Sequence, residues 1–361
     1  MKIFIGLILF LLPFIADAKI WTVDNTPGSG ADTTSLQGCI DQKAASGDTV
    51  ILMPSHIGYG VLNLYKKIFL YSRSHSNNNL DKDRSATISS VYIATSGGNS
   101  GAGSTFKGLR VTGGFNINVN NIHIQNCYIG GSSYIYQSNA LIEGCIFELL
   151  YYEMIYFTTS SNNNILAHNY ISKYLTNVSM SGPTYSVFEG GNSSNLLLNN
   201  NIFEISSGST ISGGGVVFFK NSYLKIYNNI LWSNVSNRTR FDTLSSGPAF
   251  KNNLTYSVNS NPNNLSGTGN INDSLPVFET NFTSSFLPAY RTTNDMRLKS
   301  TSPGKNRGTD STDVGLYGGN YKFSITGNVP GVAIFDDFEV LNPVIKKGDV
   351  LKVKINARKP D

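Results

Sequence analysis

Four charged residues between positions 189 and 240 carry side chains that could cut a chain of acidic sugars. Lys220, Arg238 and Arg240 are cations, and Glu189 is an acid of the same region. Eliminative cleavage of a uronate chain needs a cation near the sugar carboxylate and a base at the adjacent carbon, and one of the three cations could serve as that base. These four residues are the candidate catalytic residues, and no complete catalytic motif joins them.

Aromatic side chains in the same part of the chain are suited to binding sugar rings. Tyr152, Tyr174 and Trp232 have flat apolar faces, while Arg238 and Arg240 have planar cations that pair with carboxylates. These five are the candidate carbohydrate-binding residues. The partner they indicate is a polysaccharide, acidic if the arginines contact it. The alternative is that about half of the aromatics here pack loops onto the body of the protein.

The elements that must position these residues are copies of the phrase apolar–x–Asn–Asn–x–apolar. The first Asn position is occupied in turn by Gly108, Asn126, Gly144, His168, Asn200, Asn228 and Asn252, and successive copies are 18, 18, 24, 32, 28 and 24 residues apart. A period of this length is typical of a solenoid in which each repeat forms one coil. At His168 we expect a substitution for Asn rather than a catalytic role.

Apolar and polar residues alternate before each first Asn position, which predicts β-strands. Asn and Gly tolerate the left-handed backbone conformation, so this position should turn the chain, and stacked Asn amides can bond one another. A second turn is predicted five residues earlier, at Asn121, Asn139, Asn163 and Asn195. We expect one edge of the solenoid to carry a stacked column of Asn126, His168, Asn200, Asn228 and Asn252.

Four consecutive coils exceed the minimal coil, and their extra residues fall between the same two points of the coil. The longer segments are Glu148–Thr159, Ser172–Asn192, Ser206–Lys220 and Trp232–Ser245. Because the strand phrase has the same length in every coil, the extra residues of the longer coils should all leave the solenoid on the same side. We therefore expect a wall of loops on one side of the solenoid, beside the main binding groove.

Composition and the N-terminal residues predict an exported protein. Residues 1–18 read as a signal peptide, with Lys2, an apolar run and a small-x-small end at Ala16–Ala18. Extracellular, cell-surface or periplasmic locations all remain open, and no later segment is apolar enough to span a membrane. The net charge of +5 without a Lys/Arg run argues against nucleic acid as a partner. We expect a monomer.

The three cysteines do not form a disulfide framework. Cys127 and Cys145 occupy the same position on adjacent coils, where strands lie about 4.8 Å apart. Two buried thiols are favoured there over a disulfide. No cofactor is indicated. Calcium is a possible ion for a polyuronate site, but the acids are scattered and no Asp-rich ligand cluster or zinc-type spacing is visible.

The chain divides into a signal peptide (1–18), an N-terminal capping segment (19–48), a parallel β-helix (49–321) and a C-terminal β tail (322–361). Thr34–Ala45 is predicted as an amphipathic helix that covers the open end of the solenoid, with Leu36, Ile40 and Ala44 on one stripe. In the tail, Leu351, Val353 and Ile355 alternate with polar residues, which predicts a strand.

The segment from Thr33 to Pro54, the Asn-rich coils and the closing stretch Met296–Gly319 together resemble secreted right-handed parallel β-helix proteins of the pectate-lyase-like superfamily. The resemblance covers Trp21 to about Tyr321. It implies an all-β, right-handed β-helix, and a role in binding or cleaving polysaccharide, with polyuronate lyase as one activity. The alternative is a non-catalytic surface adhesin or glycan-binding structural protein. Fold alone does not decide between them.

Overall fold

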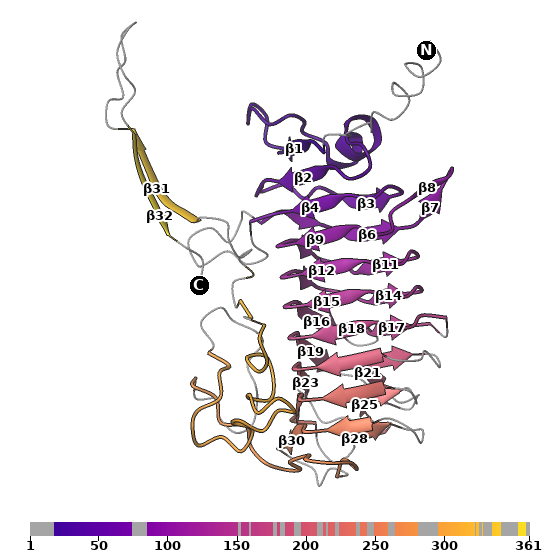
Figure 1. Ribbon diagram of the computed structural model, residues 1–361, viewed down its shortest axis with the longest axis vertical. Helices are drawn as coiled ribbons and strands as arrows, with labels where there is room; N and C mark the ends of the chain where they lie inside the picture. Colours follow the sequence, from indigo (N-terminus) through magenta and orange to yellow (C-terminus); the bar gives the residue numbers. More distant parts are fainter. Residues whose placement is uncertain are drawn as a thin grey trace, which may run out of the picture.

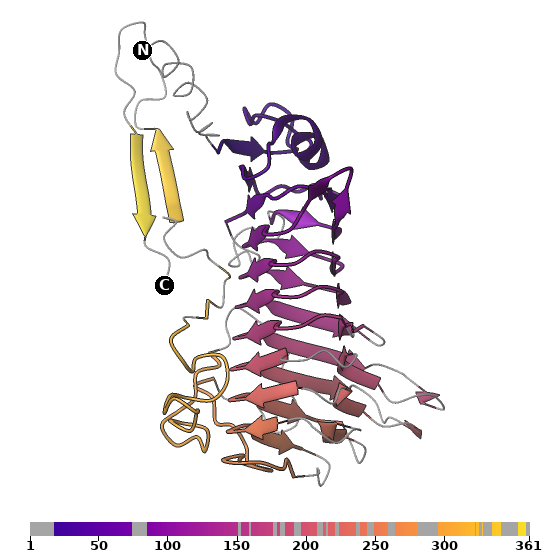
Figure 2. The same ribbon diagram turned by 45° about the vertical axis from the view of Figure 1, so that its right-hand side comes forward.

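The computed structural model is an elongated solenoid of short parallel strands (Figures 1 and 2). It describes residues 18–73, 85–150, 153–158, 160–175, 179–180, 185–190, 196–207, 212–213, 216–220, 224–235, 239–243, 249–258, 264–280, 295–321, 323–324, 327, 334–340 and 353–358. For some strand residues, Lys220 and Arg240 among them, only the backbone is described. The predicted signal peptide lies outside these residues, except for Ala18.

Three parallel sheets form the walls, and each full coil passes through them in the same order. The first sheet has ten strands. They are β1 (Ile20–Val23), β2 (Thr49–Leu52), β4 (Phe69–Tyr71), β9 (Thr105–Lys107), β12 (His123–Gln125), β15 (Leu141–Glu143), β18 (Ile165–Ala167), β22 (Leu196–Asn199), β26 (Leu224–Tyr227) and β29 (Ala249–Lys251).

The second and third sheets have eight strands each. The second contains β5 (Thr87–Ile88), β10 (Arg110–Val111), β13 (Tyr128–Ile129), β16 (Ile146–Leu150), β19 (Tyr170–Leu175), β23 (Ile202–Ser207), β27 (Ile230–Ser233) and β30 (Leu254–Ser257). The third contains β3 (Val61–Leu64), β6 (Ser90–Ile93), β11 (Phe115–Ile117), β14 (Ser133–Ile135), β17 (Ile155–Phe157), β21 (Tyr185–Gly190), β25 (Val216–Lys220) and β28 (Thr239–Thr243). The parallel β-helix predicted from the repeat is confirmed.

Three further pairs of strands lie outside these walls. β7 (Thr95–Ser96) and β8 (Asn99–Ser100) form an antiparallel hairpin, and β20 (Ser179–Met180) pairs in parallel with β24 (Ser212–Gly213). In the tail, β31 (Ile334–Val340) and β32 (Val353–Arg358) form an antiparallel pair. The strand predicted around Val353 is therefore present.

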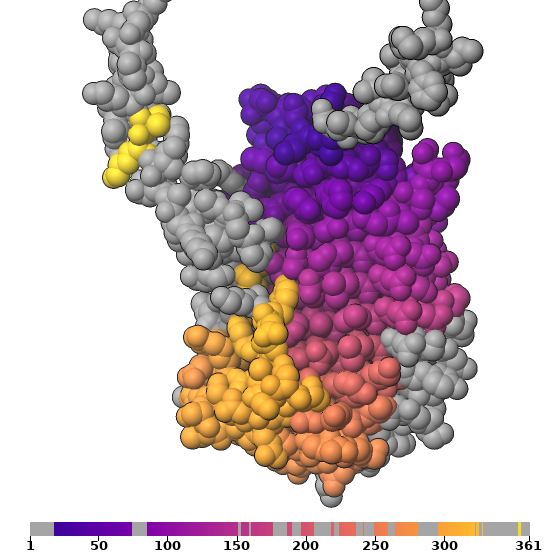
Figure 3. Space-filling model, in the orientation of Figure 1, coloured from indigo at the N-terminus to yellow at the C-terminus, as the bar shows by residue number. Residues whose placement is uncertain are grey.

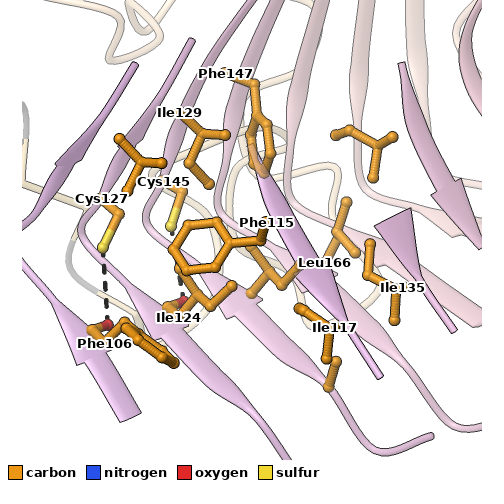
Figure 4. Packing of buried hydrophobic residues seen from close by; sticks show 14 of the residues in the cluster. Phe106, Phe115, Ile117, Ile124, Cys127, Ile129, Ile135, Cys145, Phe147 and Leu166 are labelled. Carbon is orange, nitrogen blue, oxygen red and sulfur yellow. Dashed lines mark hydrogen bonds between the residues drawn. The ribbon is translucent and has the colours of Figure 1, made fainter. Parts of the chain in front are cut away.

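The core is a stack of apolar side chains that repeat from coil to coil. On the first sheet, Phe106 pairs in register with Ile124, which pairs with Ile142, and none of these is more than 1% exposed. Figure 4 shows Phe106 and Ile124 together with Phe115 and Ile129 from the other two sheets in the interior. Because every coil buries one such layer, the hydrophobic stabilisation grows with the number of coils.

The predicted turn positions have left-handed backbones. The φ angles at Asn126, His168, Asn200, Asn228 and Asn252 lie between 51° and 59°, and Gly108 and Gly144 have 65° and 64°. The second predicted turn is present at Asn121, Asn139 and Asn163, with φ of 62°, 62° and 55°, whereas Asn195 lies outside the described residues. Asn and Gly recur here because this conformation strains other residues.

The continuous series of amides that bond from coil to coil belongs to the second Asn of the phrase, and not to the first as expected. Single bonds between coils occur at a first position, from Asn228 to Asn199, and at the earlier turn, from Asn139 to Asn121. Nδ2 of Asn169 donates to Oδ1 of Asn201 at 3.0 Å, and Nδ2 of Asn201 donates to Oδ1 of Asn229 at 2.9 Å. Each of these asparagines also donates to a strand carbonyl of the preceding coil, as Asn169 does to Ile142 at 2.9 Å. The series continues through Asn253 to Asn270.

Cys127 and Cys145 occupy this same position and are free thiols. Their Sγ atoms lie 3.7 Å from the carbonyl oxygens of Phe106 and Ile124 (Figure 4). On later coils, asparagine amides donate to the backbone carbonyls at the equivalent strand position. The thiol is a weaker donor, so the two cysteines act as small buried residues that keep the same contact. Burial raises the pKa of the Cys145 thiol.

A short helical segment covers the N-terminal end, as predicted. It consists of α1 (Leu36–Gly38) and a single π-turn, Cys39–Lys43. The expected stripe of Leu36, Ile40 and Ala44 is buried. The side chain of Gln37 accepts from the backbone N–H of Asn63 at 2.9 Å and donates to its carbonyl at 3.0 Å. This amide therefore satisfies the open edge of β3, which other chains could otherwise pair with.

The C-terminal end folds back along the outside of the second sheet. Residues 305–321, which we call the clasp, run along one side of the solenoid (Figures 1 and 3) and form hydrogen bonds with the left-handed turn residues from Asn252 to Asn126. Asn228 and Thr309 exchange two hydrogen bonds, and Asn252 donates to the carbonyl of Arg307 at 2.7 Å. A second apolar cluster lies beneath, between the sheet and the closing segment. It contains Ile146, Tyr170, Ile202, Ile230, Trp232, Leu254, Phe278, Met296, Leu298, Val314, Leu316 and Phe323.

Candidate glycan-binding face

The outer face of the third sheet carries a column of polar and aromatic side chains. In its five N-terminal strands the column contains Asn63, Tyr92, Asn116, Tyr134 and Tyr156, which are cross-strand neighbours in register. Their sequence neighbours point inward. Val91 and Ile93, for example, are at most 1% exposed, whereas Tyr92 is 36% exposed. Alternation thus places the tyrosines on the surface, because successive strand residues face opposite sides.

The tyrosine rings form two aromatic groups on this face, one on each side of Asn116. Tyr134 and Tyr156 have ring centroids 6.1 Å apart. Tyr136 follows two residues after Tyr134 on the same face, and their rings are nearly parallel, with an interplanar angle of 18° and a centroid distance of 6.3 Å. Tyr65 packs edge-on against Tyr92 at 6.3 Å. Flat rings flanked by amides are suited to stacking on sugar rings.

Two of the candidate catalytic residues continue the same column. Glu189 on β21 pairs in register with Tyr156 on one side and with Lys220 on β25 on the other. The backbone therefore brings an acid and a cation to neighbouring strands at the end of the tyrosine series. The Glu189 carboxylate also accepts from the hydroxyl of Ser186 at 3.4 Å.

The other predicted residues lie elsewhere. Tyr174 and Trp232 belong to β19 and β27 of the second sheet, so they do not share a face with Glu189. Trp232 is only 3% exposed and packs in the second apolar cluster. Its ring therefore leaves little surface free for a sugar, and its role in binding stays a prediction. Tyr152 and Arg238 lie outside the described residues. Arg240 lies on β28 of the third sheet, where its backbone pairs in register with Val217 on β25.

The long segments emerge between the second and third sheets, and two of them touch. β20 and β24 come from successive long connections and pair with each other beside the solenoid (Figure 2). This agrees with the expectation that neighbouring insertions project at one angular position. The Glu189–Lys220 pair lies on the strands that directly follow these connections.

A buried lysine forms hydrogen bonds to backbone carbonyls near Glu189. Lys173 on β19 is 1% exposed, and its Nζ donates to the carbonyls of Glu153 at 2.6 Å and Ser186 at 2.8 Å. Burial lowers its pKa to about 8, against the opposing attraction of Glu153 and Glu189. The side chain thus ties the second sheet to two coils of the third, just behind Glu189.

A separate polar cluster lies on the first sheet. Nε2 of His123 and Oε1 of Glu143 are 2.8 Å apart, and Gln125 donates to the same oxygen at 3.0 Å. No group of three or more His, Cys, Asp or Glu side chains that could hold a metal ion is found in the described part of the chain. Among the same residues, no helix has the length and apolar content needed to cross a bilayer.

The tyrosine column was not predicted from the sequence. A usable signal is the alternation of Ser133, Tyr134, Ile135 and Tyr136, which marks the two tyrosines as outward residues of a strand. Recognising the column also requires the cross-strand register, which joins residues from five coils.

A comparison with solved structures finds a similarity to a pectate lyase. The crystal structure of pectate lyase Pel9A aligns with a TM-score of 0.35 at 13% sequence identity, over 84% of this chain and 96% of that chain. No protein-family model and no curated protein matches the sequence.

Proposed function

We propose that this protein binds a polysaccharide on the outer face of its third sheet. The observation that carries the proposal is the register that places Tyr92, Tyr134 and Tyr156 in one outward column. A rigid row of aromatic rings keeps its side chains ordered before the ligand arrives, which lowers the entropic cost of binding. The solenoid repeats this row along its axis, so a polymer is a better fit than a single sugar.

The test uses the full mature chain, residues 19–361. Its binding to a panel of soluble polysaccharides is screened first, and the affinity of the best ligand is then measured by calorimetry. The variant Tyr134→Ala should weaken binding, while Tyr227→Ala serves as the matched control because Tyr227 is a half-buried tyrosine of the first sheet. If no polysaccharide binds, or if both variants behave alike, this face is not the site.

Cleavage is the second candidate function, favoured by the Glu189–Lys220 pairing at the end of the column. In this reaction the neutral amine of Lys220 would remove the proton from the carbon next to the sugar carboxylate, a carbon–carbon double bond would form, and the glycosidic C–O bond would break, with its oxygen taking a proton from water. A neighbouring Glu189 carboxylate favours the charged form of the lysine, so cleavage should increase toward alkaline pH. Absorbance of unsaturated products from a polyuronate measures this activity directly. Lys220→Ala should abolish it while binding persists. Binding without product formation would favour the non-catalytic adhesin or structural role. For either function we propose that the protein acts outside the cytoplasm.

A further inference from the structure

We propose that the ligand of this face is an uncharged, extended chain of pyranose sugars, rather than a polyuronate. The inference rests on the proposed function, because it specifies the ligand of the same surface. It departs from the acidic glycan that the arginines of the sequence indicated.

The chemistry of the face is uncharged throughout its N-terminal part. Outward positions on β3, β6, β11, β14 and β17 alternate with buried apolar residues. They are Val61, Asn63, Ser90, Tyr92, Asn116, Tyr134 and Tyr156. A polyuronate carries one carboxylate on every sugar, and each carboxylate would lose water against phenol rings without gaining a cation. Hydroxyl groups, by contrast, find amide and hydroxyl partners there.

The order of residues along the column matches an extended chain. Tyr92 and Tyr134 lie on strands separated by one strand, which carries Asn116. With about 4.8 Å between neighbouring strands, the two tyrosines are roughly 10 Å apart along the axis. In an extended β-linked chain, alternate sugars turn opposite faces to the surface, so the same face returns at every second sugar. From β3 to β14 the column alternates between amide and ring, in the order Asn63, Tyr92, Asn116, Tyr134, which fits that alternation, and Tyr156 adds a further ring on the next strand.

The amide between the rings is held in place. Oδ1 of Asn116 accepts from Nδ2 of Asn118 at 2.7 Å, and both residues lie on the face. At the N-terminal side, the β7–β8 hairpin follows β6 after one residue, and its Thr95 hydroxyl bonds that of Ser100 at 3.1 Å. Uncharged hydroxyl and amide groups therefore continue around the rings, and the first charged pair of the column is Glu189–Lys220.

The experiment compares cellohexaose, maltohexaose and hexagalacturonate by calorimetry with the full mature chain, at low and high salt. We expect cellohexaose to bind best, with little effect of salt because no ion pair forms. Tyr92→Ala and Tyr134→Ala should each weaken it by roughly three- to tenfold, as expected for loss of one aromatic contact. Tyr227→Ala should leave it unchanged.

A gain-of-function variant provides a second test. Asn116→Lys places a cation between the rings and should create measurable, salt-sensitive binding of hexagalacturonate. Hexagalacturonate binding to the unmodified chain, tighter than cellohexaose and weakened by salt, would overturn the uncharged ligand while leaving the proposed function intact. Equal binding of maltohexaose would overturn the extended chain. Failure of all three sugars and of every polysaccharide tested would remove the proposed function itself.

Discussion

The hydroxyl of Tyr321 donates a hydrogen bond of 2.7 Å to Oδ1 of Asn126, although the two residues are 195 positions apart. The Tyr321 ring also stacks on His168, with centroids 4.9 Å apart, and Nδ1 of His168 lies 3.1 Å from the carbonyl of Leu316. First-position residues of the phrase thus contact the clasp. This explains why the coil-to-coil amide series belongs to the second Asn, which faces the interior.

Loss of the Tyr321–Asn126 bond should destabilise the fold modestly. Tyr321→Phe keeps the ring on His168 and removes the donor, so the free energy of unfolding should fall by about 1 kcal/mol. Asn126→Gly removes the acceptor and keeps the left-handed backbone (φ 51°). The double variant in urea denaturation should show a coupling between the two. Strictly additive effects would mean that the bond contributes nothing.

The two asparagines of one phrase should differ in their sensitivity to leucine. Asn201→Leu leaves the carbonyl of Leu166 and the Asn169 amide without their partners, each costing about 1–3 kcal/mol. Asn200→Leu loses longer contacts of 3.4 and 3.3 Å to the clasp carbonyls of Asp313 and Gly315, and strains a backbone with φ of 53°. Thermal melts should show the larger loss at Asn201. A larger loss at Asn200 would contradict the interior role of the second position.

Because Lys173 is buried, the free energy of unfolding should vary with pH in the alkaline range. Its folded pKa of about 8 is below that of an unfolded lysine, so the unfolded chain binds more protons between the two values. Stability contributed at this site should therefore rise with pH from about 8 to about 10.4, the value of a free lysine. The comparison is with Lys173→Met, because other groups titrate in both proteins. A stability difference that is flat across this window would refute the lowered pKa.

Trp232→Ala should affect folding rather than glycan binding. The ring is buried in the second apolar cluster, and truncation of a buried large aromatic costs about 3–5 kcal/mol. Tyr134→Ala on the exposed face should show the opposite pattern, with little change in melting temperature and weaker glycan binding. Measuring both properties on both variants separates the two faces. A stable Trp232→Ala protein with lost affinity would restore the tryptophan to the binding site.

Removing the Gln37 side chain should leave backbone groups of β3, the edge strand of the third sheet, without their hydrogen-bond partners. Gln37→Ala frees the backbone N–H and carbonyl of Asn63 on β3, both of which its amide satisfies. We expect concentration-dependent association measured by light scattering, because unpaired strand edges recruit other chains. Gln37→Glu keeps the acceptor and loses the donor, so its effect should be intermediate. Monomeric behaviour of Gln37→Ala at all concentrations would show that the edge is protected by other means.

Local rules in the sequence determined the solenoid. Alternating apolar residues, left-handed Asn and Gly positions and the capping stripe at Leu36, Ile40 and Ala44 each reflect the preference of a short segment, and the structure has them all. The turn at His168 follows the same rule with a different residue. Each of these features depends on only a few consecutive residues, so the sequence is enough to predict it.

Only the tertiary structure decided which side chains meet. Trp232 reads as an exposed aromatic in the sequence, but it is buried in a cluster that includes Phe278 and Met296, which come more than 40 residues later in the chain. Conversely, Tyr92, Tyr134 and Tyr156 are far apart in the chain and are joined by strand register. Register depends on the lengths of the intervening coils and on packing across the core, which no local pattern contains. The solenoid could therefore be predicted from the sequence, whereas its binding face followed from the stacking of coils.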